Sequence, residues 1–157
     1  MATISAGDIA FIGFNADGND DFAIVALTDL DGSSTAFDVT FTDNEWDGSL
    51  FNGGEGTLTW TIDSLISAGT VIAFNNTSNA GSVTASVGSV SLSGSLNLGA
   101  SNEAIFAFTG TLASPYTFLA AIANDDFGAA SATLTNTGLV VGTTAIELDG
   151  VDADADV

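Results

Sequence analysis

The chain has 157 residues, of which 20 are Asp or Glu and none is Lys, Arg or His, so its formal net charge is −20. Nucleic acids and anionic membrane surfaces are held chiefly by basic side chains, so this composition argues against both partners. A hydrophobic fraction of 46% and a mean hydropathy of +0.42 exclude an acidic disordered chain. The length predicts a single domain, residues 1–157, with a sizeable core.

The expected elements are short strands, because apolar residues recur with period two and each run is closed by Gly, Asn, Asp or Ser. In chain order they cover residues 8–15, 22–28, 36–42, 57–62, 70–74, 82–98 (a hairpin that turns near Gly88), 104–109, 117–122, 132–134 and 143–148. About ten short strands at this spacing predict an all-β fold, a two-sheet β-sandwich or jelly roll.

Three local predictions accompany this strand pattern. Residues 63–67 alone look helical, with Asp63 or Ser64 as the N-cap, and Pro115 indicates a turn before a strand. The inward positions of the period-two runs should form the core. These positions are Phe11, Phe22, Ile24, Phe41, Trp60, Phe74, Phe106 and Phe118.

The residue types that the chain lacks also limit the catalytic chemistry it can perform. Without Cys there is no disulfide or thiolate nucleophile, and without His the commonest general base and transition-metal ligand is absent.

No apolar run approaches the roughly 18 residues of a membrane-spanning helix, so membrane insertion is not expected. The residues after Met1 lack the features of a Sec signal peptide. Two explanations stay open: a removed signal, or type I secretion directed by the acidic, Ala-rich C-terminus.

Residues 82–101 form a low-complexity stretch of Ser, Gly, Val, Ala and Leu. Their alternation places small apolar side chains on one face and hydroxyls on the other. One interpretation is an ordinary pair of strands with a smooth solvent face. The other is a surface that meets a second subunit, because proteins usually avoid uncharged sheet edges.

A family resemblance is carried by residues 8–27 (DIAFIGFNADGNDDFAIVAL), 41–48 (FTDNEWDG) and 54–60 (GEGTLTW). These motifs resemble a domain of bacterial and cyanobacterial surface or secreted proteins, usually recognisable by Phe-Thr-Asp-Asn-Gly-Trp and a following Glu-Gly-Thr-Leu-Thr-Trp. Residues 117–122 and 139–148 agree with it, so the resemblance covers nearly the whole chain. Glu45 stands where the pattern commonly has Gly and adds a carboxylate beside Asp43. The resemblance implies an extracellular location and a β-rich fold, without a defined activity.

The Asp residues are clustered in expected loops. Residues 15–21 resemble the first half of a calcium loop but lack the distant Glu of an EF-hand. One interpretation is that Asp and Asn merely cap and turn the backbone. The other is that a divalent cation offsets the repulsion of 20 carboxylates, and Ca²⁺ suits irregular oxygen sets better than Mg²⁺. The predicted ligands come from Asp17, Asp20, Asp21, Asp29, Asp31, Asp43, Asp47, Asp125, Asp126, Asp149 and Asp152, with the 15–21 and 43–47 loops ranked highest.

Paired carboxylates can serve a glycosidase, but the chain has no basic residue to orient a substrate, so no enzymatic activity is predicted. Trp60 alternates with Leu58 and Ile62 and belongs in the core, whereas Trp46, in an acidic loop, is expected to have a surface role.

The leading functional hypothesis is an extracellular structural protein whose copies assemble into a filament or surface layer stabilised by calcium. It rests on the resemblance, on the smooth segment 82–101 and on the need for counter-ions. The alternative is a calcium-dependent adhesion or carbohydrate-binding module with surface glycans as partners.

Overall fold

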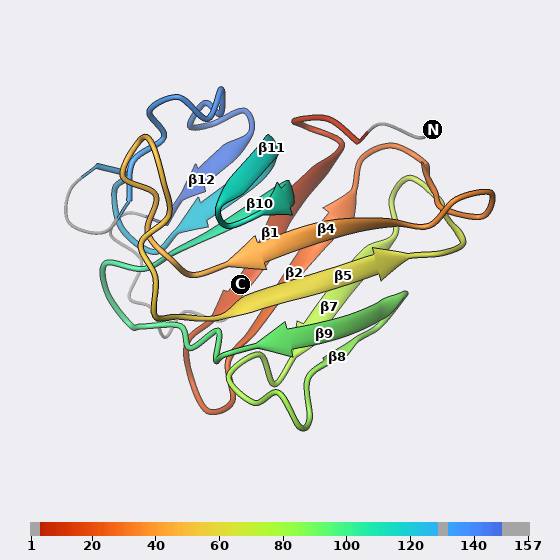
Figure 1. Ribbon diagram of the computed structural model, residues 1–157, viewed down its shortest axis with the longest axis horizontal. Helices are drawn as coiled ribbons and strands as arrows, with labels where there is room; N and C mark the ends of the chain where they lie inside the picture. Colours follow the sequence, from red (N-terminus) through yellow and green to blue (C-terminus); the bar gives the residue numbers. More distant parts are fainter. Residues whose placement is uncertain (1–3, 129–131, 149–157) are drawn as a thin grey trace.

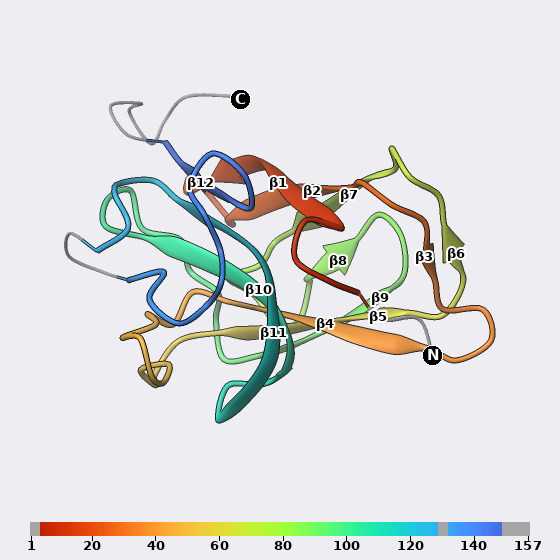
Figure 2. The ribbon, with the colours of Figure 1, turned by 90° about the horizontal axis from the view of Figure 1, so that it is seen from above.

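The computed structural model describes residues 4–128 and 132–148, and in these ranges it contains strands but no helix. The all-β prediction is therefore confirmed. Figure 2 shows two main layers, with β1 (Ile9–Asn15) and β2 (Asp21–Ala26) in one and β4 (Phe37–Thr42) and β5 (Thr57–Ile62) in the other. This arrangement is a β-sandwich.

The smaller layer is a four-stranded antiparallel sheet with the order β1-β2-β7-β8, where β7 is Val71–Asn75 and β8 is Thr84–Ala85. A separate two-stranded sheet joins β3 (Leu30–Asp31) to β6 (Leu65–Ile66). It connects the two layers at the right of Figure 2.

The larger layer is a six-stranded sheet with the order β12-β11-β10-β4-β5-β9. Its remaining strands are β9 (Ser89–Ser93), β10 (Ala104–Thr111), β11 (Ser114–Ala123) and β12 (Ala145–Glu147). All neighbours are antiparallel except β12, which runs parallel to β11.

The main core lies between the two sheets, because alternate residues of their strands are apolar and point inward. In β5 this alternation buries Leu58, Trp60 and Ile62 completely. Trp60 meets Phe74 of the opposite sheet edge to face, with ring centroids 5.6 Å apart. Burial of each such large aromatic side chain stabilises the fold by about 1.5–3 kcal/mol.

A second apolar cluster covers the outer face of β10 and β11, where Phe106, Phe108 and Phe118 point away from the main core. Trp46 and Phe51, from the loop between β4 and β5, lie over these rings. The expectation of a surface role for Trp46 is wrong in this respect, since only 5% of the side chain is exposed. That face of β10 and β11 is apolar, and it would be exposed to water if the loop did not fold back over it.

The eight residues expected in the core are all buried, although two of them, Phe106 and Phe118, belong to the second cluster. The helix expected at residues 63–67 is wrong. Leu65 and Ile66 form β6 instead, because a single helical turn is unstable alone and pairing with β3 buries Ile66.

Three further expectations differ from the structure. Pro115 lies inside β11, opposite Gly110, near the strand start where a missing N–H is tolerated. Residues 132–134 form a loop over the second cluster rather than a strand. Residues 82–98 are not one hairpin: β8 pairs with β7, whereas β9 pairs with β5, so the chain crosses from one sheet to the other between them.

Candidate functional site

One edge of the sandwich is built from residues 64–102, none of which carries an ionisable side chain. This run contains β6, β7, β8 and β9, and the last two are the terminal strands of the four-stranded and six-stranded sheets. Both strands lie at the lower rim of Figure 1 and contact each other. We call residues 84–93 the β8–β9 edge. It brings the ends of both sheets together on a surface without charge.

Strand β9 has the features of an unprotected edge strand. Ser89, Ser91 and Ser93 are exposed, whereas Val90 and Leu92 are half-buried against the main core. Within the described residues β9 pairs with β5 on one side and with no strand on the other. Its outward N–H and C=O groups can therefore pair with another chain, and β9 contains neither the charge nor the Pro that usually prevents this.

The turn between β8 and β9 is fixed to the core by Trp60. The indole Nε1 of this fully buried residue donates a hydrogen bond to the Val87 carbonyl oxygen at 2.8 Å. Gly88 has φ 75°, and a Cβ atom there would lie 2.7 Å from the Thr61 carbonyl oxygen. A glycine is required at this position both for its backbone conformation and for this close approach. The edge is thus held in a defined place.

The segment that follows β9 is anchored by three carboxylates from three separate parts of the chain. Three consecutive backbone N–H groups donate to them: Asn97 to Asp43 Oδ2 (2.8 Å), Leu98 to Asp20 Oδ2 (3.2 Å) and Gly99 to Glu103 Oε2 (2.9 Å). We call Asp20, Asp43 and Glu103 the carboxylate anchor. Asp43 Oδ1 also accepts from the Gly56 N–H at 2.9 Å. These bonds satisfy backbone groups that no strand pairs.

Burial shifts the ionisation of this anchor. It raises the pKa of Asp43 to about 6, although three backbone hydrogen bonds oppose the shift. Burial likewise raises the pKa of Glu103 to about 7, and repulsion from Asp43 and Glu55 adds to this effect. The pKa of Glu55 is also raised to about 7, first by burial and then by Asp43 and Glu45. The pKa of Asp20 is raised in the same direction, chiefly by burial. Asp43, Glu55 and Glu103 therefore exchange protons near neutral pH.

The structure distributes the predicted calcium ligands over several loops. Asp17, Asp20 and Asp21 lie at the β1–β2 connection, Asp29 and Asp31 near β3, Asp43 and Asp47 between β4 and β5, and Asp125 and Asp126 after β11. Asp149 and Asp152 lie outside the described residues.

Several of these carboxylates accept hydrogen bonds from nearby backbone, as the turn-forming interpretation predicts. Asp31 Oδ1 accepts from the Ser33 N–H at 3.0 Å, and Asp47 Oδ1 accepts from the Ser49 N–H at 2.7 Å. Among the described residues, no three Asp or Glu side chains are grouped closely enough to hold one metal ion. Calcium binding stays a prediction.

The two loops ranked highest do come together, because Asp20 and Asp43 hold the adjacent residues Leu98 and Asn97. Sequence reasoning missed Glu103 and Glu55, which complete this acidic region. Both are isolated in the sequence rather than clustered. The sequence did contain one indication, because Glu103 is the first acidic residue after the uncharged run. At that position its carboxylate accepts hydrogen bonds from the nearby backbone N–H groups of Gly99 and Ala104.

Comparison of the chain with protein-family models, with curated proteins and with solved structures found no match. In the described ranges, no helix has the length and apolar character needed to cross a membrane.

Proposed function

We propose that the protein is an extracellular structural subunit that assembles with copies of itself into a filament or surface layer, and that the β8–β9 edge is a contact between copies. The observation that carries this proposal is the position of the uncharged run, which supplies the terminal strands of both sheets. Two chains of charge −20 repel each other, and this edge lets them approach without adding a close pair of like charges.

The pattern of β9 suits a second copy of the same strand. If two β9 strands pair antiparallel around Ser91, Val90 of one copy lies opposite Leu92 of the other. The half-buried side chains of both strands then face the core side, and the hydroxyls of both face outward. The six-stranded sheet would continue across the contact, and the outward backbone groups of β9 would be paired.

Calcium and the extracellular location belong to the same proposal. The chain has no Lys, Arg or His to neutralise its 20 carboxylates, and a hard divalent cation can do so outside the cell, where calcium is abundant. The extracellular location is supported by the resemblance to bacterial surface or secreted proteins.

A charge placed on the edge tests the proposal. Ser91→Asp adds a negative charge to β9, whereas Ser34→Asp adds the same charge to an exposed loop between β3 and β4. Light scattering and negative-stain microscopy, in millimolar calcium, should show ordered polymers of the unmodified chain and of Ser34→Asp. Ser91→Asp should stay monomeric while its circular dichroism remains that of the unmodified chain. Polymers of folded Ser91→Asp at unchanged yield, or a monomeric unmodified chain, would refute the proposal.

A further inference from the structure

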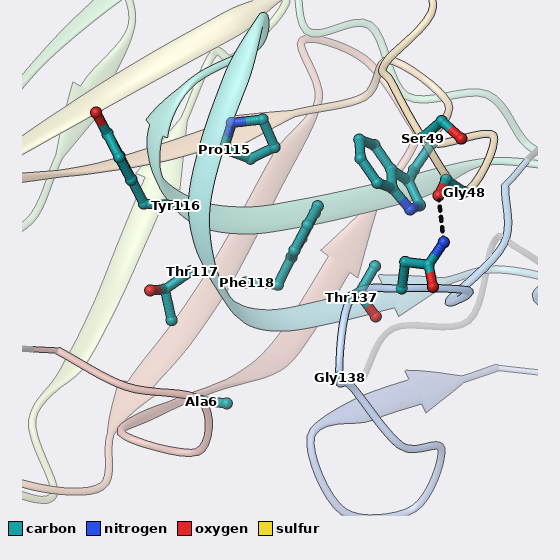
Figure 3. Close-up of a pocket in the computed structure, with 11 residues that line it drawn as sticks. Ala6, Gly48, Ser49, Pro115, Tyr116, Thr117, Phe118, Thr137 and Gly138 are labelled. Atoms are coloured by element: carbon teal, nitrogen blue, oxygen red, sulfur yellow. Dashed lines mark hydrogen bonds between the residues drawn. The ribbon is translucent and has the colours of Figure 1, made fainter.

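A cleft of about 560 Å³ opens beside the start of β11, away from the β8–β9 edge. Figure 3 shows Pro115, Tyr116 and Thr117 of β11 on one side and Gly48 and Ser49 of the β4–β5 loop on the other. Clefts that bind small molecules have volumes of roughly 300–1,000 Å³, so the size is suitable.

The chemistry of the lining is neutral. Its exposed aromatic surface is chiefly that of Tyr116, because Trp46 and Phe118 are only 5% and 8% exposed, and polar groups come from side chains such as Ser49, Thr117 and Asn136. None of the lining residues is an Asp or Glu, in a chain that carries 20 of them. The cleft therefore offers a cation no carboxylate ligand, and the net charge of −20 repels an anion.

Tyr116 is the most exposed large side chain among the apolar and aromatic residues described, at 83%. One edge of its ring nevertheless contacts the strand β10. Gly110, opposite the start of β11, has φ 99°, and a Cβ atom there would lie 2.8 Å from Tyr116 Cδ2. The edge of the ring thus lies against the bare backbone of Gly110. A flat aromatic ring open to water offers a surface on which a ligand can stack.

The opposite wall is also fixed before any ligand arrives. Asn136 Nδ2 donates to the Gly48 carbonyl oxygen at 2.8 Å, the bond drawn as a dashed line in Figure 3. Trp46 Nε1 donates to the Thr135 carbonyl oxygen at the same distance, 2.8 Å. These two bonds tie the β4–β5 loop to the loop of residues 132–140. Preformed walls reduce the entropy lost when a ligand binds.

We infer that this cleft binds a neutral saccharide, with Tyr116 as the stacking platform. The hydroxyls of Ser49, Thr117 and Tyr116 form no hydrogen bond with another described residue, so they can both donate to and accept from sugar hydroxyls. An exposed aromatic ring beside a cleft also suits a Pro-rich peptide, but free hydroxyls on both sides of the cleft match a ligand that carries many hydroxyls itself. The inference does not depend on self-assembly, because the cleft and the β8–β9 edge share no residue.

Calorimetric titration with neutral tetrasaccharides tests this inference, using cellotetraose, xylotetraose, mannotetraose and N-acetylated chitotetraose. At least one should bind, and tetragalacturonate, which is anionic, should bind at least tenfold more weakly. Trp46 lines the cleft, so binding should also change the tryptophan fluorescence. No binding by any neutral probe at about 10 mM, or a preference for a Pro-rich peptide, would overturn the inference.

Substitutions of Tyr116 locate the site. Tyr116→Ala should weaken binding at least tenfold, whereas Tyr116→Phe keeps the ring and should stay within about threefold of the unmodified protein. Leu65→Ala is the matched control, because Leu65 is a large side chain, 54% exposed, on β6. Equal affinity of folded Tyr116→Ala and the unmodified protein would show that the saccharide binds elsewhere and would overturn the assignment of this cleft.

Discussion

The carboxylate anchor predicts that the protein becomes less stable as the pH rises from about 5 to about 8. Burial raises the pKa of Asp43 to about 6, from 3.8, so between these two values the folded chain keeps a proton that the unfolded chain has released. Where the folded state binds more protons, the free energy of unfolding falls with increasing pH. The contribution that protonated Asp43 makes to the free energy of unfolding is fully present below pH 3.8 and is lost as the pH rises through about 6.

The magnitude follows from the same two pKa values. For Asp43 alone, proton linkage gives a loss of about 1.4 kcal/mol between pH 5 and pH 8. Glu103 and Glu55, each with a pKa raised to about 7, act in the same direction. Both are partly solvated, so their contributions are reduced by screening. Against a typical total stability of about 5–15 kcal/mol, the expected loss is readily measured.

Urea denaturation at several pH values, at fixed ionic strength and without divalent cations, measures the slope of the free energy of unfolding against pH. Asp43→Asn removes the titrating group but keeps one oxygen to accept from Gly56 or Asn97. It should therefore reduce the pH dependence by about 1.4 kcal/mol over the same interval. Asp63→Asn, an exposed site after β5, is the control and should leave the slope unchanged. A stability that is constant or increases from pH 5 to pH 8, or an unchanged slope in Asp43→Asn, would refute the argument.

Two further predictions concern packing and calcium. Gly56→Ala should destabilise the fold by more than about 2 kcal/mol, because its Cβ atom would lie 2.2 Å from the Leu96 backbone nitrogen. Gly53→Ala, whose Cβ atom would meet nothing within 4 Å, should change the free energy of urea unfolding by less than about 1 kcal/mol, and equal losses in both variants would contradict this explanation. Millimolar calcium should raise the melting temperature more at pH 8 than at pH 5, because protons and calcium compete for carboxylates. Identical melting curves with calcium and with chelator would refute calcium binding.

The fold class and the main core could be predicted from the sequence because both depend on local patterns. Alternation with period two places Leu58, Trp60 and Ile62 on one face of a strand whatever its neighbours are. The absence of charge in residues 82–101 was likewise visible, and this segment contains β8, β9 and so the whole β8–β9 edge.

Only the tertiary structure decided which strands are neighbours and which loops fold back on them. Residues 82–98 divide between two sheets because each strand pairs with a different partner, and a local alternation does not specify that partner. Trp46 is buried because the outer face of β10 and β11 is apolar, a fact known only once those strands are paired. The carboxylate anchor likewise joins Asp20, Asp43 and Glu103 from distant parts of the chain. Sequence patterns specify which face of an element is apolar, whereas contacts between distant elements depend on how all those faces are buried together.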